Sequence, residues 1–246
     1  MQEYLDTNIG ICLPSYNESD NINNLINKIL NIGKNITVCV VDDNSPDQTF
    51  NLVSENFKNN KNVHIIKREK KDGRGSAVWD GFKFLSSLSK NINIYVEMDC
   101  DFSHSVEDLI KGIRLKNDLD CDVLLGSRYP NGTIINWPIN RRIFSFISNI
   151  LIRNLIDKSI HDYTNGFRFY NKRALDIILE KKPLNKGFIY LSETLCFFLI
   201  KGIKIKSFPI TFKNRIRGKS NTNFQEIFNS LKGIIKIHRN YRRWKN

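Results

Sequence analysis

The chain has 246 residues, of which 41% are hydrophobic and 26% are charged, a composition and length that fit one globular domain with a sizeable core. No apolar run approaches the roughly 20 residues of a membrane-spanning helix, and "MQEYLDTNIG" at the start has neither part of a signal peptide. The net charge of +13 favours an anionic partner without choosing among nucleic acid, a membrane surface and an anionic substrate.

Strand-like and helix-like patterns alternate along the first half of the chain. Five runs are predicted to be strands: IGICLP, ITVCVVD, NVHIIK, INIYVEMD and CDVLLGS. Helices are expected from near Ser19 or Asp20, after a cap at Ser45 or Asp47, over 77–88 and over 106–115. This alternation predicts right-handed βαβ units and an α/β fold with a doubly wound, mostly parallel sheet.

Polar segments follow four of these strands: PSYNES, DDNSPD, EKKDGRG and DCDFSH. In parallel sheets the ligand crevice lies beyond the carboxyl ends of the strands, so we expect these segments to surround one site. Neither GxGxxG nor a P-loop follows the first strand, which argues against a nicotinamide dehydrogenase and a P-loop NTPase. Five single cysteines without a CxxC pair are expected to be buried, reduced thiols.

Four residues at the first two strand ends suit a nucleotide. Tyr16 offers an aromatic face beside the rigid Pro14, and Glu18 and Asp43 can accept hydrogen bonds from a base or a ribose. Each has an ordinary alternative, such as a strand-end aromatic for Tyr16 or a favourable helix-start charge for Glu18. Their occurrence on adjacent strand ends favours a binding site.

Asp99 and Asp101 follow the fourth strand and form either a metal clamp or an acidic turn. Mg²⁺ and Mn²⁺ prefer oxygen ligands and usually share their shell with phosphates and water, so one or both carboxylates suit such an ion. Ser103 or His104 could complete or orient the shell, although a helix cap is the more ordinary role for Ser103 or Ser105.

Seven ordered motifs resemble family-2 glycosyltransferases of the GT-A fold, and within them the dolichol-phosphate mannosyltransferases: LPSYNESDNI, VVDDNSPDQT, DGRGSAVWDGF, EMDCDFSHS, GSRYPNG, TNGFRFY and FPITFKNRIRGKS. The resemblance covers about residues 9–238. It implies a GT-A fold with helices on both faces of the sheet. We expect a catalytic domain over 1–223 and, as part of the same domain, an amphipathic helix and basic tail over 224–246.

The resemblance also assigns site residues. Five positions match the family's guanosine site: Pro14, Tyr16, Glu18, Val41 and Asp43. Three match its DxD segment, with Asp101 the first choice for the metal: Asp99, Cys100 and Asp101. Four are expected to meet donor or acceptor phosphates: Ser127, Arg128, Arg215 and Arg217. Asn221 stands where the family usually has a lysine, and Lys219 or Arg217 could replace that charge.

The implied reaction is inverting transfer of mannose from GDP-mannose to dolichyl or polyprenyl phosphate for protein glycosylation, with Mg²⁺ or Mn²⁺. A phosphate monoester has a second pKa of about 6, so the acceptor is already anionic and needs no general base. The chain agrees in offering no Ser–His–Asp arrangement and only 4 His. UDP-glucose is the rival donor.

Two segments have amphipathic helical patterns flanked by basic residues, RRIFSFISNILIRNLI and FQEIFNSLKGIIKIHRNYRRW. Each either lies on a membrane surface or packs on the core. The resemblance is to members held by small anchoring subunits at the cytoplasmic face of the endoplasmic reticulum. NYRRW is a faint echo of the QxxRW motif of polysaccharide synthases. Nucleic-acid binding is not expected, because it leaves the acidic strand ends unexplained.

Overall fold

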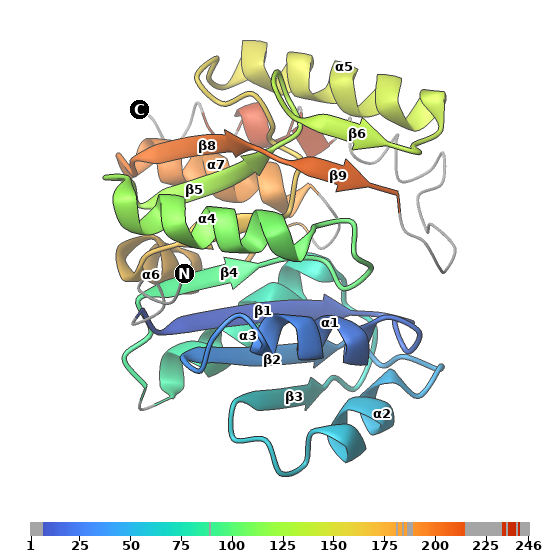
Figure 1. Ribbon diagram of the computed structural model, residues 1–246. Helices are drawn as coiled ribbons and strands as arrows, with labels where there is room; N and C mark the ends of the chain where they lie inside the picture. The colour runs from blue at the N-terminus through green and yellow to red at the C-terminus, as the bar shows by residue number, and fades with distance from the viewer. Residues whose placement is uncertain are drawn as a thin grey trace.

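A seven-stranded sheet forms the centre of the computed structural model, which describes residues 7–88, 90–180, 182–183, 185, 189–214, 233–234, 236–239 and 241 (Figure 1). The strand order is β3-β2-β1-β4-β7-β5-β8. Its strands are β1 (Ile9–Ser15), β2 (Ile36–Asp42), β3 (Val63–Lys67), β4 (Ile94–Glu97), β5 (Val123–Ser127), β7 (Arg168–Tyr170) and β8 (Ile205–Pro209). β6 (Thr133–Ile135) and β9 (Thr211–Lys213) pair separately.

The five predicted strands are confirmed, and those that pair directly with each other are parallel. β7 was not predicted from the sequence. It is only three residues long and runs antiparallel to both β4 and β5 between them. A strand this short carries too little alternation to be recognised from its sequence.

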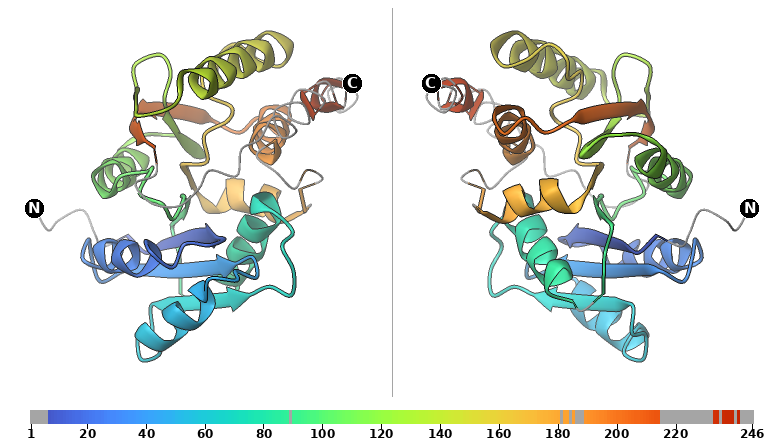
Figure 2. Two further views of the ribbon diagram at one scale, coloured as in Figure 1. Left: turned by 90° about the vertical axis from the view of Figure 1, so that its right-hand side faces the viewer. Right: turned by 90° about the vertical axis from the view of Figure 1, so that its left-hand side faces the viewer.

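Helices cover both faces of the sheet, as expected (Figure 2). They are α1 (Ile22–Leu30), α2 (Thr49–Asn56), α3 (Arg74–Ser87), α4 (Val106–Asp118), α5 (Ile139–Leu155), α6 (Lys172–Glu180) and α7 (Tyr190–Ile200). One hydrophobic core contains residues of α1, α2 and α4, and a second contains residues of α3, α6 and α7. Strand side chains alternate between them, so Val40 joins the first core and Val41 the second.

The helix starts differ in part from the predictions. α4 is capped by Ser105, whose Oγ accepts from the Asp108 amide at 2.9 Å, as predicted. α1 begins at Ile22, after the expected caps Ser19 and Asp20. Ser19 is engaged elsewhere, because its amide donates to Asp47 Oδ2 at 3.0 Å and so joins the first two strand-end loops.

The C-terminal segment is described only at 233–234, 236–239 and 241, so the expected helix over 224–246 lies mostly outside the described residues. Ile234, Ile237 and Tyr241 are buried, the last two in a cluster with Cys196 of α7. All five cysteines are buried and free, which confirms their prediction. In the described part of the chain, no helix has the length and hydrophobicity to cross a membrane.

The contact between α4 and β7 yields a stability prediction. A Cβ on Gly112 would lie 2.1 Å from Cζ of the fully buried Phe169, so Gly112→Ala should lower the free energy of unfolding by about 1–3 kcal/mol through overpacking. Denaturant unfolding measures this, with the exposed Asp118→Ala on the same helix as control. Equal stability of Gly112→Ala and wild type would contradict the packing of α4 on β7.

Candidate active site

A pocket of about 140 Å³ lies beyond the carboxyl ends of β4 and β5. Its charged lining residues are Arg74, Asp99, Asp101, Arg128 and Arg141. The structure therefore brings together the two predicted aspartates and one predicted arginine, and adds two arginines that the sequence did not single out. The rest of the lining combines aromatic rings and isoleucine side chains with hydroxyl and amide groups, several of them from α5 and the 164–166 loop.

The loop after β4 holds Asp99 and Asp101 in defined positions. Asp101 Oδ1 accepts from the Ser103 amide at 3.0 Å, and the Asp99 amide donates to Nδ1 of His104 at 3.1 Å. His104 is fully buried, and its Nε2 lies 3.0 Å from Oδ1 of Asn165. Because Nδ1 accepts from a backbone amide it carries no proton, so the ring is neutral and braces the loop. Burial acts in the same direction, since it lowers the pKa of His104.

The two carboxylates fit a magnesium or manganese ion. Both are hard oxygen donors lining one pocket, which is the chemistry these cations prefer. Among the described residues, no group of three or more His, Cys, Asp or Glu side chains could hold a metal by itself. In proteins, Mg²⁺ and Mn²⁺ usually complete their shell with phosphates and water.

Arg74, at the start of α3, is a site residue that the sequence analysis missed. Its Nε donates to Asp99 Oδ1 at 3.0 Å, Nη2 donates to the Gly166 carbonyl at 3.0 Å, and Nη1 contacts the Tyr190 hydroxyl. Burial disfavours the charged guanidinium, but Tyr190, Asp99 and Glu97 outweigh it and raise the pKa of Arg74. In the sequence, Arg74 stands in the glycine-bearing segment DGRG, and this pattern alone does not predict a contact with Asp99.

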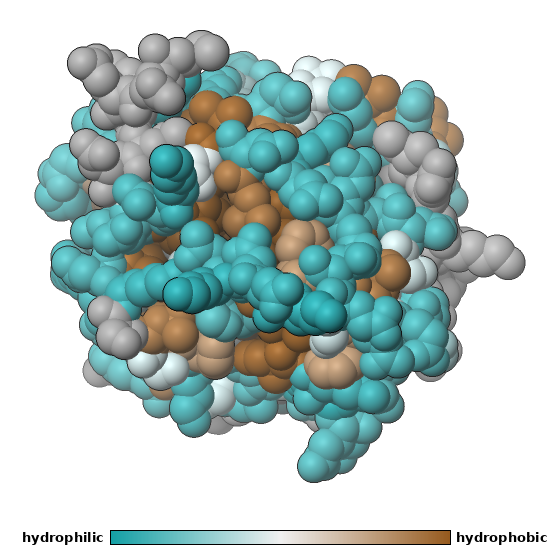
Figure 3. All heavy atoms as spheres, turned by 60° about the horizontal axis from the view of Figure 1, so that its bottom comes forward, coloured by the Kyte–Doolittle hydropathy of each residue, from teal (hydrophilic) through white to brown (hydrophobic). Residues whose placement is uncertain are grey.

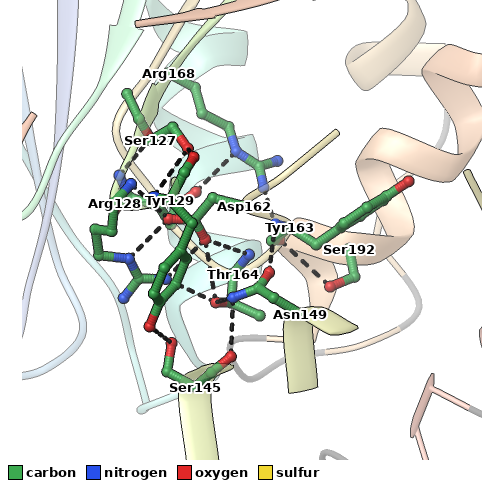
Figure 4. Close-up of polar contacts among 12 residues, drawn as sticks. Ser127, Arg128, Tyr129, Ser145, Asn149, Asp162, Tyr163, Thr164, Arg168 and Ser192 are labelled. Carbon is green, nitrogen blue, oxygen red and sulfur yellow. Dashed lines mark hydrogen bonds and ion pairs between the residues drawn. The ribbon is translucent and has the colours of Figure 1, made fainter. Parts of the chain in front are cut away.

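Arg128 is fixed by a bidentate ion pair with Asp162 (Figure 4). Both bonds measure 2.8 Å, and the Arg128 amide donates to the same carboxylate at 3.0 Å. Nη2 also donates to Thr164 at 2.7 Å. Burial opposes ionisation of Asp162, yet its bonds with Arg128 outweigh burial and lower the pKa of Asp162.

Aromatic rings surround the Arg128 guanidinium. Its Cζ lies 5.3 Å from the ring centre of Trp137 and 5.5 Å from that of Phe212. Arg141 stacks on the same Trp137 ring at 4.1 Å. Three arginines thus line the same pocket as the two aspartates.

The residues expected to bind the nucleotide differ in their exposure and in their contacts. Asp43 is buried and accepts from Arg68 at 2.7 Å and from the amides of Asp72 and Gly73, so its carboxylate organises the loop before α3. Tyr16 remains accessible in part, with Lys71 Nζ 3.6 Å from its ring centre. Glu18 is buried and accepts from Asn21 Nδ2 at 3.1 Å.

Three further expectations concern side chains that the structure turns away from the pocket. Val41 packs in the core against α3, and Cys100 donates from its buried thiol to the Pro14 carbonyl at 3.3 Å. The buried Ser127 bonds to Tyr129 and is not part of the pocket lining. Four predicted residues lie outside the described part of the chain: Arg215, Arg217, Lys219 and Asn221.

Residues 10–179 match Glycosyl transferase family 2, which covers more than half of the chain. The chain belongs to this family. Membership agrees with the mostly parallel sheet flanked by helices.

Among the family-2 relatives is a polyprenol monophosphomannose synthase of Mycolicibacterium smegmatis, 35% identical over 159 residues, which are 64% of this chain and 59% of the relative. An undecaprenyl-phosphate mannosyltransferase of Micrococcus luteus is 32% identical over 160 residues, 65% of this chain and 64% of the relative. The matched part thus spans less than two thirds of each relative's length.

Solved structures of the same fold include glucosyl-3-phosphoglycerate synthase from Mycobacterium tuberculosis. Its complex with Mn²⁺, UDP and glucosyl-3-phosphoglycerate has a TM-score of 0.67 at 14% identity and covers 96% of this chain and 80% of that one. Its complex with Mg²⁺ and UDP has a TM-score of 0.66 at 14% identity, with coverage of 96% and 79%. At 14% identity, this structural likeness supports the fold of the chain and no more than the fold.

The Arg128–Asp162 pair yields the second prediction. Asp162→Asn leaves a buried guanidinium without its counter-charge and should lower the free energy of unfolding at neutral pH by about 3–5 kcal/mol. Because the pKa of Asp162 is lower when folded, its contribution is complete above the ordinary carboxyl pKa and disappears as pH falls through the folded value. The deficit of the variant should therefore shrink on acidification.

Chemical denaturation at several pH values measures this deficit. Asp120→Asn, which removes an exposed carboxylate paired with Lys204, is the matched control and should change stability far less. A deficit for Asp162→Asn that stayed constant down to strongly acid pH would contradict the linkage.

Proposed function

We propose that the protein transfers mannose from GDP-mannose to the phosphate of a polyprenyl phosphate, dolichyl phosphate included, with inversion at the anomeric carbon. The observation that carries the proposal is the pocket that Asp99 and Asp101 share with three arginines. One of these, Arg128, is fixed by its ion pair with Asp162. Both ends of such a reaction are phosphates. The names of the two mannosyl-transferring relatives support the choice of sugar and of lipid class.

The chemistry asks for positioning more than for proton transfer. An oxygen of the anionic acceptor phosphate forms the new bond to the anomeric carbon, the bond from that carbon to the diphosphate oxygen breaks, and the nucleoside diphosphate leaves with the electron pair. Arg128, held by Asp162, offers a preorganised positive charge for a phosphate. A divalent cation on Asp99 and Asp101 would offset the charge of the leaving diphosphate.

A buried neutral His104 is consistent with this scheme, in which no general base is needed. Its Nδ1 accepts from a backbone amide and its Nε2 is committed to Asn165, so its polar atoms brace the loop. The acceptor supplies its own negative charge, because a phosphate monoester is largely doubly ionised at pH 7.

The transfer assay tests the proposal. Labelled mannose from GDP-mannose should appear in a short polyprenyl phosphate with Mn²⁺ or Mg²⁺, and UDP-glucose, the rival donor, should give far less product. Asp99→Ala and Asp101→Ala should each lower turnover about 100-fold or more, because the charge of the leaving group loses its counter-ion. Asp176→Ala, an exposed carboxylate on α6, is the matched control.

Wild-type rates in both site variants would contradict the metal role of the aspartates. Preferential transfer from UDP-glucose would replace the proposed donor while keeping the reaction type. Absence of product with every donor and polyprenyl phosphate would contradict the function itself.

We also propose that α5 rests on a membrane surface. Seven of its hydrophobic side chains are exposed: Ile139, Ile143, Phe146, Ile147, Ile150, Leu151 and Leu155. Its buried face is largely polar and includes Ser145, Ser148 and Asn149. Figure 3 brings the bottom of the view in Figure 1 forward, and on that face hydrophilic residues predominate while hydrophobic ones lie mostly recessed between them. A lipid acceptor gives such a helix a reason to be apolar outside.

Flotation with anionic liposomes tests the membrane role of α5. The double variant Ile143→Glu/Ile147→Glu should bind at least about tenfold less, because two half-exposed isoleucines lose burial and two charges repel the lipid. Asn56→Glu/Asn59→Glu adds the same charge by α2, at the opposite end of the molecule from α5 (Figure 1). Equal binding by both double variants would contradict the role of α5.

Two finer parts of the proposal, the location of the protein and its anchoring, depend on the acceptor. If the acceptor is dolichyl phosphate, we expect the protein at the cytoplasmic face of the endoplasmic reticulum, where its product would serve protein glycosylation. Small anchoring subunits would then help to hold it at the membrane. The relatives' names favour the wider polyprenyl class.

A further inference from the structure

Arg74 is held in a fixed position beside the aspartate pair. Its contacts reach the loop after β4 through Asp99, the loop before β7 through the Gly166 carbonyl, and the start of α7 through Tyr190. Its side chain is 11% exposed. A guanidinium bound on three sides cannot swing away without breaking several hydrogen bonds, so its charge stays next to Asp99.

Arg74 belongs to a cluster whose formal charges cancel. Its Nη1 lies 3.6 Å from Oε2 of Glu97, and Glu97 Oε1 lies 3.9 Å from Nε of Arg168. Glu97 is completely buried and also accepts from the hydroxyls of Tyr170 at 3.2 Å and Tyr190 at 2.8 Å. The two arginines thus match the charges of Glu97 and Asp99, and Asp101 adds one negative charge to the aspartate pair.

This balance acts differently on two kinds of ligand. A bare divalent cation that approaches Asp99 is repelled by the neighbouring guanidinium. A nucleoside diphosphate carries more negative charge than one divalent cation cancels, so the complex of the two is anionic and is attracted by the same guanidinium. Arg74 lines the pocket itself, so this charge lies where such a complex would bind.

We propose that Arg74 is a specificity-determining residue that makes the aspartate pair favour a divalent cation accompanied by a diphosphate over the cation alone. The inference rests on the proposed function for the identity of the ligand. It explains the placement of an arginine on a metal-binding carboxylate, which would otherwise only weaken the site. The cation and the nucleoside diphosphate would then bind together and leave together.

A purely structural role for Arg74 makes a different prediction. If the arginine only anchored α3 and oriented Asp99, its removal would weaken both kinds of binding. If its charge sets the preference, removal strengthens binding of the bare cation and weakens binding of the diphosphate complex. The two effects have opposite signs, which separates the roles.

The experiment uses the full chain, Arg74→Met and Arg74→Lys. In a titration with Mn²⁺ alone, monitored by the electron paramagnetic resonance of the free ion, Arg74→Met should bind the ion at least about threefold more tightly than the wild type does. In calorimetric titrations with GDP, and in parallel with UDP, at saturating Mn²⁺, the same variant should bind the nucleotide at least about threefold more weakly than the wild type does. Arg74→Lys keeps the charge and should stay close to wild type in both titrations.

Arg173→Met is the matched control, because it removes a positive charge that pairs with Asp122 at the amino-terminal end of β5, outside the pocket lining. It should change neither titration. Unchanged or jointly weakened binding by Arg74→Met overturns the inference, and circular dichroism checks that the variant is folded. If the wild-type protein binds no Mn²⁺ even when GDP or UDP is present, the metal assignment is overturned as well. If mannose transfer is normal but the two titrations of Arg74→Met do not shift in opposite directions, this inference alone is overturned.

Discussion

The burial of Arg168 on β7 is the constraint on which the site depends. Its guanidinium has no exposed surface, so every donor must find an acceptor or cost several kcal/mol. It donates to the carbonyls of Tyr163, Asn165 and Leu191, at 3.1, 3.0 and 2.9 Å. These bonds fix the loop before β7 and the first turn of α7 relative to the sheet. The same loop carries Asp162 and Thr164, so the position of Arg128 depends on a side chain that never reaches the pocket.

A second consequence concerns the kind of site this is. Its charged groups are preorganised by other protein groups: Arg128 by Asp162, Arg74 by Tyr190 and Gly166, and the aspartate loop by His104. Groups that are already oriented need little reorganisation when charge moves during a reaction. A scaffold of this kind suits the displacement of one phosphate oxygen by another, where no proton has to be shuttled and the main demand is a fixed electrostatic environment.

The sequence predicted the parts of this arrangement that depend on local pattern. Long apolar runs identified β1 and β2, and Ser105 was a recognisable cap because capping acts over three residues. Asp99 and Asp101 could be found because they follow a strong strand directly. The partners Arg74 and Asp162 could not, since they contact residues 25 and 34 positions away in the chain. The contacts of Asp43 with Arg68, Asp72 and Gly73 could not be predicted for the same reason, because these partners lie 25 to 30 positions away in the chain.

The inverted amphipathicity of α5 has a kinetic meaning. Its polar face lines the pocket through Ser145 and Ser148, while its apolar face is the exposed one. If α5 rests on a bilayer as proposed, the enzyme would meet a lipid acceptor at a density per unit of surface and no longer at a concentration per unit of volume. Its rate would then follow the mole fraction of acceptor among the surrounding lipids, so carrier lipid would slow the reaction even when the total amount of acceptor is unchanged.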